Sequence, residues 1–263
     1  MSEDRSTAQG KRVAIVTGSS SGIGAATALE LARRGWRVVI NYSKSAAEAG
    51  KVAAGCADAG GEAIAVQADV GRDAECRGLA QAALDRWGRL DALVNNAGAT
   101  KFVAHADLDG LSAEDFQRIY SINVIAPFQM SRACAPALKA SGRGAIVNVS
   151  SLGALLGTGS SIAYAASKGA LNTMTLSLAR VLGPEIRVNT VCPAFVATPW
   201  QIAAHGAERV AERSARFASV APLQRASEPE DIAETIVWLV EGARQVTGEI
   251  IFVDGGMHIV ASR

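Results

Sequence analysis

Tyr164 and Lys168 are a pair of side chains that could carry out acid–base chemistry. Residues 164–168 read Tyr-Ala-Ala-Ser-Lys, and side chains four residues apart lie on one face of a helix. A free phenol has a pKa of about 10, too high for proton transfer near neutrality. A neighbouring ammonium favours the phenolate, so we predict that Lys168 lowers the pKa of Tyr164 toward the working pH. An isolated pair of this kind also occurs on ordinary helix surfaces.

Two other polar segments follow predicted strands and could join this pair. Ser151 stands just after the strand expected at Ala145–Val149, and Asn95–Gly98 ends the neighbouring strand, expected at Ala92–Asn95. In parallel sheets, ligands bind beyond the carboxyl ends of the strands. We therefore expect these residues to meet the Tyr–Lys pair at one edge of the sheet.

A glycine-rich loop, Thr-Gly-Ser-Ser-Ser-Gly-Ile-Gly at residues 17–24, separates the first predicted strand from the first predicted helix. Its three glycines permit a tight exit from the strand, a close approach to a pyrophosphate, and close packing of helix on strand. The helix offers free N–H groups and a positive dipole to phosphates. The pattern predicts a dinucleotide site formed by Gly18, Ser20, Ser21, Gly22, Ile23 and Gly24.

The same loop has a second interpretation. Residues 18–22 also fit G-x-S-x-G, the nucleophile elbow of α/β-hydrolases. That elbow normally follows several strands, and an acid and a histidine come later in the chain. Here the loop follows the first strand, and the last histidine, His258, lies five residues from the C-terminus. The dinucleotide site is therefore favoured.

The end of the second predicted strand bears on which dinucleotide is bound. Enzymes selective for NAD usually place an acid there, about 20 residues beyond the loop, to hold the ribose hydroxyls. Residues 41–44 contain no carboxylate, whereas Ser43 and Lys44 could bind a 2′-phosphate. We therefore favour NADP, held in part by Asn41, Tyr42, Ser43 and Lys44. NAD remains open, because Lys44 could be an ordinary surface lysine.

The elements that must position these residues alternate along the whole chain. Seven apolar runs are typical of strands buried on both faces: Val13–Thr17, Val38–Asn41, Ala63–Gln67, Ala92–Asn95, Ala145–Val149, Arg187–Val191 and Glu249–Val253. Six helical patterns lie among them: Gly24–Arg34, Ala46–Ala59, Arg72–Trp87, Ala113–Leu138, Ile162–Leu182 and Pro229–Val240. This alternation predicts an α/β fold of the Rossmann type, a doubly wound, mostly parallel seven-stranded sheet with helices on both faces.

No linker or repeat divides the chain. We expect a disordered N-terminal tail at residues 1–10 and a single dinucleotide-binding and catalytic domain at residues 11–263. The one long irregular stretch, Pro193–Leu223, is interpreted as a mobile flap that carries a helix.

Composition narrows the class of protein. Lys plus Arg total 26 against 25 for Asp plus Glu, so no general field attracts nucleic acid or an anionic membrane. The four cysteines and three histidines are scattered, which predicts free thiols and no metal site. The sequence has neither a signal-peptide pattern nor an apolar run long enough to cross a bilayer, so we expect a cytoplasmic protein.

These motifs, in their order and spacing, resemble those of the short-chain dehydrogenases/reductases of the compact, single-domain branch. The resemblance runs from Lys11 to His258 and rests on the glycine loop, Asp69-Val70, Asn95–Gly98, Asn123, Ser151, Tyr164 with Lys168, and Asp254–Gly256. It implies an NAD(P)-dependent oxidoreductase that moves a hydride to or from a carbonyl or hydroxyl carbon.

The resemblance also implies a role for each matched residue. Tyr164 would exchange the proton at the substrate oxygen, Lys168 would hold the nicotinamide ribose, and Ser151 would bind the carbonyl oxygen. Asn123 would fix a water that relays protons to solvent, although it could be only a helix-distorting core residue. Further dinucleotide contacts are implied for Asp69, Val70, Asn96, Ala97, Gly98, Pro193, Val196 and Thr198. Of these, Asn96 could simply link two strand ends.

The expected substrate pocket is apolar. Leu152, Phe195 and Trp200 would line it beside Ser151 and Tyr164, which suits a small hydrophobic ketone or alcohol. The substrate itself and the direction of the reaction stay open.

The sequence is similar to 3-oxoacyl-(acyl-carrier-protein) reductases, which offers an alternative function. Those enzymes bind an acidic carrier protein through basic residues near the active-site mouth. Glu185 stands at the matching position here and has the wrong charge, while Arg143 and Lys139 are expected nearby. A non-catalytic dinucleotide-binding regulator is a further alternative, disfavoured by the intact Asn–Ser–Tyr–Lys set. The resemblance also implies a homotetramer.

Overall fold

The computed structural model describes residues 10–260, and its centre is a parallel sheet of seven strands in the order β3-β2-β1-β4-β5-β6-β7. The strands are β1 Val13–Val16, β2 Arg37–Tyr42, β3 Glu62–Gln67, β4 Ala92–Asn95, β5 Gly144–Val149, β6 Ile186–Pro193 and β7 Ile250–Val253. All neighbouring strands pair in parallel, which confirms the predicted Rossmann-type sheet. The order reverses between β1 and β4, the place where such folds bind ligands. The tail predicted at residues 1–10 lies outside the described residues, apart from Gly10.

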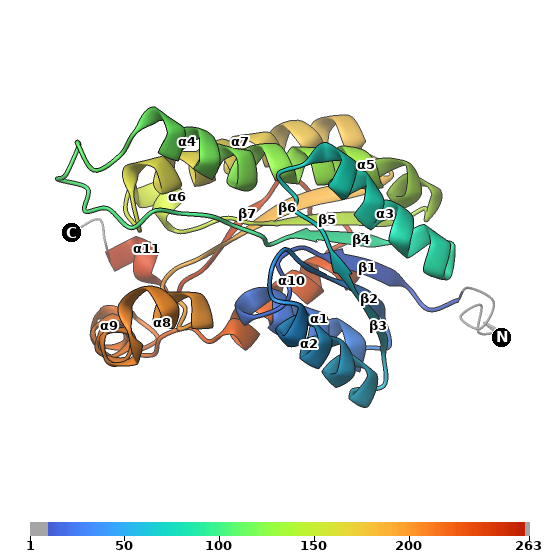
Figure 1. The fold of residues 1–263 in the computed structure, drawn as a ribbon, viewed down its shortest axis with the longest axis horizontal. Helices are drawn as coiled ribbons and strands as arrows, with labels where there is room; N and C mark the ends of the chain where they lie inside the picture. Colours follow the sequence, from blue (N-terminus) through green and yellow to red (C-terminus); the bar gives the residue numbers. More distant parts are fainter. Residues whose placement is uncertain (1–9, 261–263) are drawn as a thin grey trace.

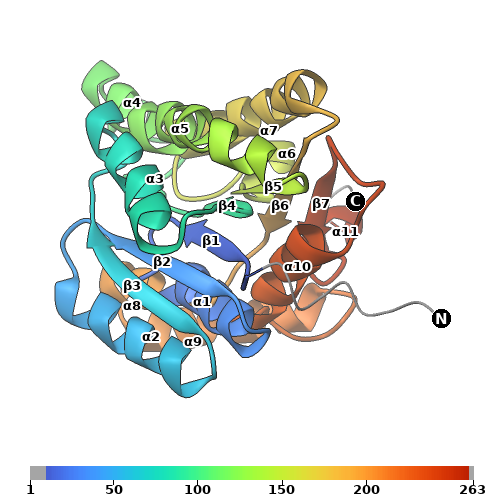
Figure 2. The same ribbon diagram turned by 90° about the vertical axis from the view of Figure 1, so that its right-hand side faces the viewer.

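Helices cover both faces of the sheet (Figures 1 and 2). One face carries α1 Gly22–Arg33, α2 Ala46–Asp58 and α10 Pro229–Glu241. The other carries α3 Asp73–Trp87, α5 Ala126–Ala140 and α7 Ile162–Leu182. Among the described residues, no helix combines the length and the apolar character needed to span a membrane.

The core forms two layers because successive residues of each strand point to opposite faces. In β1, Ala14 and Val16 pack toward α1, α2 and α10, whereas Val13 and Ile15 pack toward α3, α5 and α7. All four side chains are fully buried. The near-continuous apolar strands predicted from the sequence are therefore covered on both sides, which holds the loops at the carboxyl edge in fixed positions.

The helix predicted at Ala113–Leu138 is not continuous. It is divided into α4 Ala113–Tyr120, a π-helical turn η1 Ser121–Ile125, and α5. The turn carries Asn123, whose Nδ2 donates to the Ala99 carbonyl at 2.9 Å and whose Oδ1 accepts from the Ala99 N–H at 2.8 Å. These two bonds tie the π turn to the loop after β4. Such π turns occur frequently at functional sites.

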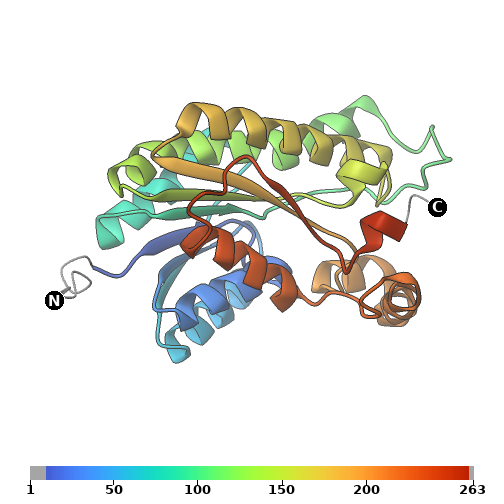
Figure 3. The ribbon, with the colours of Figure 1, turned by 180° about the vertical axis from the view of Figure 1, so that it is seen from behind.

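The segment after β6 carries two helices where the sequence predicted one. They are α8 Pro199–His205 and α9 Ala207–Val220, separated by Gly206 with a φ of +82°. Both lie at the end of the molecule where the strands terminate, together with the short α6 Gly153–Leu156 and α11 Met257–Val260 (Figures 1 and 3). The mobility of this segment stays a prediction.

Candidate active site

A cleft of about 750 Å³ opens at the carboxyl edge of the sheet. Most of the residues predicted to bind dinucleotide or substrate line it: Gly18, Ser20, Ser21, Gly22, Ile23, Asn41, Ser43, Lys44, Asp69, Val70, Asn96, Ala97, Gly98, Ser151, Tyr164, Lys168, Pro193, Val196, Thr198 and Trp200. The structure thus brings together segments spread between Gly18 and Gln201. The volume of the cleft is in the range of pockets that hold organic ligands.

The glycine loop forms the floor of the cleft in a conformation that side chains would block. Gly18 and Gly22 have φ values of +60° and +56°, a region that favours glycine. A methyl group at Gly18 would also lie 2.9 Å from the Ala97 Cα. One at Gly24 would lie 2.6 Å from the Gly18 carbonyl oxygen. Gly24 itself does not line the cleft. It packs against the backbone of Gly18 and Ser19, on the side of the loop that faces away from the cleft.

The first helix begins without a side-chain cap. Ser21, at its N-cap, makes no capping hydrogen bond, whereas Ser112 and Ser161 cap α4 and α7. The first N–H groups of α1 therefore stay free to bind an anion, with the helix dipole adding to the attraction. An uncapped helix facing a cleft through a glycine loop fits the diphosphate of a dinucleotide.

Two asparagines hold this loop in place. Asn96 donates from Nδ2 to the carbonyls of Thr17 and Gly18 at 2.9 and 3.0 Å, and Asn41 accepts from the Gly18 N–H at 3.0 Å. The Thr17 hydroxyl accepts in turn from the N–H groups of Asn96 and Ala97. Asn96 therefore links two strand ends, as its structural alternative predicted, and it also lines the cleft.

The far end of the cleft carries a free positive charge. Lys44 is exposed, lines the cleft beside Ser43, and has no ion-pair partner anywhere in residues 10–260. The position is suited to an anionic group on the bound molecule, since nothing in the described chain neutralises the ammonium.

The other end of the cleft carries three polar side chains that lie close together: Tyr164, Lys168 and Ser151. The Lys168 Nζ lies 5.7 Å from the centre of the Tyr164 ring and donates to the Val149 carbonyl at 2.7 Å. Ser151 hydrogen-bonds the Tyr164 phenol. The neighbouring Ser150 hydroxyl instead donates to the Lys168 backbone carbonyl at 3.2 Å. The geometry thus places Ser151, rather than Ser150, beside the phenol.

The pKa of Tyr164 corrects one expectation. Burial raises it to about 12, and the hydrogen bond with Ser151 only partly opposes that effect. Burial also lowers the pKa of Lys168 to about 8. The predicted lowering of the phenol pKa by the ammonium is therefore wrong for the protein by itself, because burial disfavours the charged form of both groups.

Asn123 lies behind this group rather than on the cleft wall. It is fully buried, and its Nδ2 also donates to the Ser167 hydroxyl at 3.0 Å. A methyl group built on Gly98 would lie 3.6 Å from the Asn123 Oδ1 and 3.9 Å from the Lys168 Nζ. The asparagine and the lysine thus approach the same small space beside Gly98.

Three other predicted residues do not line the cleft. Tyr42 packs against the core beside α1 and α2, because alternation along β2 turns it to the opposite face of the sheet from Asn41. Leu152 is 6% exposed and points into the protein. The ring of Phe195 packs under the Arg213 guanidinium, 4.8 Å from its centre. We correct these three assignments accordingly.

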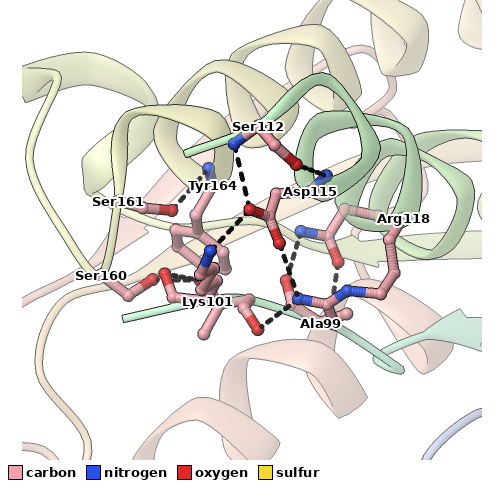
Figure 4. Close-up of polar contacts among 10 residues, drawn as sticks. Ala99, Lys101, Ser112, Asp115, Arg118, Ser160, Ser161 and Tyr164 are labelled. Carbon is pink, nitrogen blue, oxygen red and sulfur yellow. Dashed lines mark hydrogen bonds and ion pairs between the residues drawn. The ribbon is translucent and has the colours of Figure 1, made fainter. Parts of the chain in front are cut away.

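The structure also places residues on the cleft that the sequence did not reveal, among them Ala99, Arg118, Ile122 and Gln201. Figure 4 shows how the first two are held. Arg118 donates to the Thr100 carbonyl at 3.3 Å, and Lys101 forms a 2.7 Å ion pair with Asp115 at the start of α4. The Thr100 hydroxyl bonds Ser160 at 2.6 Å. The loop after β4 is thereby attached to both α4 and the segment before α7.

Replacing Lys168 by methionine should change how stability depends on pH. Between the folded pKa of about 8 and the ordinary value of 10.5, the unfolded chain keeps a proton that the folded chain has lost. Raising the pH through this window therefore stabilises the wild type, by at most about 1.4 kcal/mol per pH unit. The variant lacks this gain. Urea unfolding from pH 7 to 10 should show wild-type stability rising relative to Lys168→Met. A difference between wild type and Lys168→Met that stays constant over this range would contradict a Lys168 pKa lowered by burial.

The fold and cleft define a dinucleotide-binding oxidoreductase, and sequence comparison agrees. Residues 18–258 match the family described as enoyl-(acyl carrier protein) reductase. The chain belongs to the short-chain dehydrogenase/reductase family, whose members are NAD(P)-dependent enzymes that act on C=O or CH–OH groups.

Several relatives extend over almost the whole chain. A protein described as a ketoacyl reductase of the granaticin polyketide synthase of Streptomyces violaceoruber is 42% identical over 94% of this chain and 96% of its own length. A 3-oxoacyl-[acyl-carrier-protein] reductase of Synechocystis is 37% identical, with 95% and 98% covered. These matches confirm the predicted family and activity class.

Two solved structures are similar in fold and sequence. A crystal structure described as a short-chain dehydrogenase/reductase of Burkholderia xenovorans has a TM-score of 0.88 and 43% identity, covering 95% of this chain and 99% of that one. A 7α-hydroxysteroid dehydrogenase complexed with NADH and 7-oxo glycochenodeoxycholic acid has a TM-score of 0.84 and 31% identity, with 93% of both chains covered.

Proposed function

We propose that residues 11–263 act as one domain that reduces or oxidises a small hydrophobic ketone or alcohol with NADP(H). The observation that carries the proposal is the convergence of Tyr164, Lys168 and Ser151 at one end of a cleft whose other end is an uncapped helix behind a glycine loop. The bound nicotinamide supplies or accepts the hydride. The loop residues and α1 would hold its diphosphate, and Asp69 and Val70 would contact the adenine.

Tyr164 is the proton donor in the direction of reduction. Its raised pKa keeps the hydroxyl protonated until a substrate oxygen takes the proton. Ser151 donates to the same oxygen and so stabilises the negative charge that develops there. Lys168, when protonated, stabilises the phenolate that remains after transfer. Asn123 would fix the water through which the proton relay reaches solvent, from its buried position bonded to Ala99 and Ser167.

Lys44 would select NADP by binding the 2′-phosphate. Its free ammonium lines the cleft, and no carboxylate follows β2 to bind a free ribose hydroxyl. We expect Lys44→Ala to weaken NADPH binding about tenfold and to leave NADH binding unchanged. Fluorescence titration of both cofactors measures this, with the exposed Lys51→Ala as a matched control. An unchanged NADPH affinity in Lys44→Ala would remove the case for this lysine.

An apolar mouth supports a hydrophobic substrate. Trp200 lines the cleft and its ring lies 5.9 Å from that of Phe102, and both rings are more than one-third exposed. The alternative substrate, a carrier-bound acyl group, loses the support of a basic residue expected near the mouth. Arg143 and Glu185 lie at the opposite edge of the sheet, so they do not stand near this mouth. The ketoacyl relatives still favour a β-ketoacyl group as the second candidate substrate.

A spectrophotometric screen tests the proposal. Oxidation of NADPH is followed with hydrophobic cyclic ketones, β-ketoacyl thioesters in free and carrier-bound form, and sugars. Turnover of the ketones supports the proposal. Turnover of carrier-bound thioesters alone supports the alternative, and turnover of sugars alone overturns both.

We also propose that the protein is a homotetramer. Large apolar side chains are exposed on three helices, namely Phe128 on α5, Leu176 and Val181 on α7, and Trp238 on α10. These side chains lie on both faces of the sheet and would be covered by neighbouring subunits in a tetramer. Light scattering should give four times the 27.1 kDa chain mass. A monomeric mass at micromolar concentration would contradict the expectation.

A further inference from the structure

A second cavity, of about 290 Å³, lies at the amino edge of the sheet, opposite the cleft. It is formed by the segments that precede β1, β2, β4, β5 and β6 and by the end of α10. Its size is close to the lower bound for pockets that hold small organic ligands. None of its lining residues belongs to the candidate active site.

The wall of this cavity has an excess of positive charge. Two of its three carboxylates are already neutralised: Asp91 binds Arg89 through both oxygens at 2.6 and 2.9 Å. Glu241 binds Arg12 at 2.6 Å and Arg34 at 3.1 Å. The third, Glu185, stands at the exposed rim with no ion-pair partner in residues 10–260.

Three arginines on the same wall form no ion pair with a carboxylate of residues 10–260. Arg187 is partly buried and donates to the last carbonyls of α10, Leu239 and Val240, at 2.7 and 3.1 Å. Arg143 is close enough to Arg187 for their charges to repel. The side chains of Arg143 and Arg244 make no hydrogen bond or ion pair within residues 10–260. With Glu185 counted, two positive charges remain uncompensated.

We propose that this cavity binds a small dianion bearing a phosphate group, held by Arg143, Arg187 and Arg244. Guanidinium groups match phosphate oxygens through paired hydrogen bonds, and their affinity is greatest where two or more converge. A dianion balances the residual charge of the wall, whereas a monoanion does not. The proposal is independent of the redox function, because the cavity and the cleft share no residues.

Calorimetric titration with inorganic phosphate at about 0.05 M salt tests this. We expect binding by the wild type and a loss of about tenfold or more in affinity in Arg143→Gln/Arg244→Gln. Arg216→Gln, which changes an exposed arginine of α9, should bind phosphate like the wild type. Raising the salt to about 0.5 M should weaken the binding. Both replaced side chains are exposed, so the melting temperature should stay unchanged and report that the variant is folded.

Four results would overturn the proposal. One is an absence of binding by the wild type, and another is equal binding by the double variant. The third is a loss confined to Lys44→Ala, which would place the anion in the cleft. A fall in the light-scattering mass of the double variant would also overturn it, since the arginines would then bind a second copy of the chain.

Discussion

Tyr164→Phe is expected to lower turnover by about 10²- to 10⁴-fold while dinucleotide affinity stays nearly unchanged. The substitution removes only the hydroxyl, and the ring keeps its packing against Lys168. The proton at the substrate oxygen then has no donor with a suitable position. Ser151 remains, but it stabilises charge and cannot supply a proton at this rate. Steady-state rates and fluorescence titration with NADPH measure the two quantities separately.

Tyr120→Phe is the matched control for this prediction. Tyr120 ends α4, lines no part of the cleft, and its hydroxyl has no hydrogen-bond partner in residues 10–260. The control should retain wild-type turnover. If Tyr164→Phe also retained it, the assignment of the proton donor would be wrong, whatever the fold of the protein.

Gly24→Ala should have the second-largest effect. The added methyl group would lie 2.6 Å from the Gly18 carbonyl oxygen and 2.9 Å from the Ser19 Cα, so the loop must move away from α1. We expect unfolding stability to fall by about 1–3 kcal/mol, as for other overpacked sites. Dinucleotide affinity should fall by about 100-fold, because the displaced loop no longer presents its N–H groups to the diphosphate.

A second glycine separates this effect from a general intolerance of alanine. Gly50 lies within α2 and has open space around it. Gly50→Ala should leave dinucleotide affinity unchanged and add up to about 1 kcal/mol of stability, because alanine favours the helix. Urea unfolding and cofactor titration of both variants make the comparison. Equal affinity in Gly24→Ala and wild type would show that the loop does not hold the dinucleotide.

Local patterns were sufficient to predict the sheet and the cleft. The apolar strands and the intervening helices constrain the connections to right-handed crossovers, which leaves few sheet orders. The carboxyl edge of that sheet then collects the glycine loop, Ser151 and Tyr164 without further information. The capping box at the start of α4 is equally local, since Ser112 and Asp115 lie within four residues of sequence.

Features that depend on contacts between distant segments could not be predicted. The π turn at Asn123 is bonded to a loop 24 residues earlier through two hydrogen bonds, which local sequence patterns do not reveal. Arg118 reaches the cleft only because the loop after β4 passes beside α4. The lowered pKa of Lys168 reflects the burial of its ammonium, which donates to the Val149 carbonyl. The spacing of residues along the sequence does not reveal this burial.

The misplaced Arg143 and Glu185 have a geometric cause. α7 has 21 residues, and at 1.5 Å per residue it is about 30 Å long. Tyr164 stands near its start at one edge of the sheet, and the residues after its end reach the other edge. Residues close to the C-terminal end of α7 therefore lie far from the active site. Arg143 and Glu185 line the amino-edge cavity instead.

A crystal structure with NADPH bound is the most direct test of the account. The account predicts the diphosphate at the N-terminus of α1 and the nicotinamide ring beside the Tyr164 hydroxyl, with Ser151 across from it. A dinucleotide seated elsewhere, or a nicotinamide ring remote from Tyr164, would contradict it.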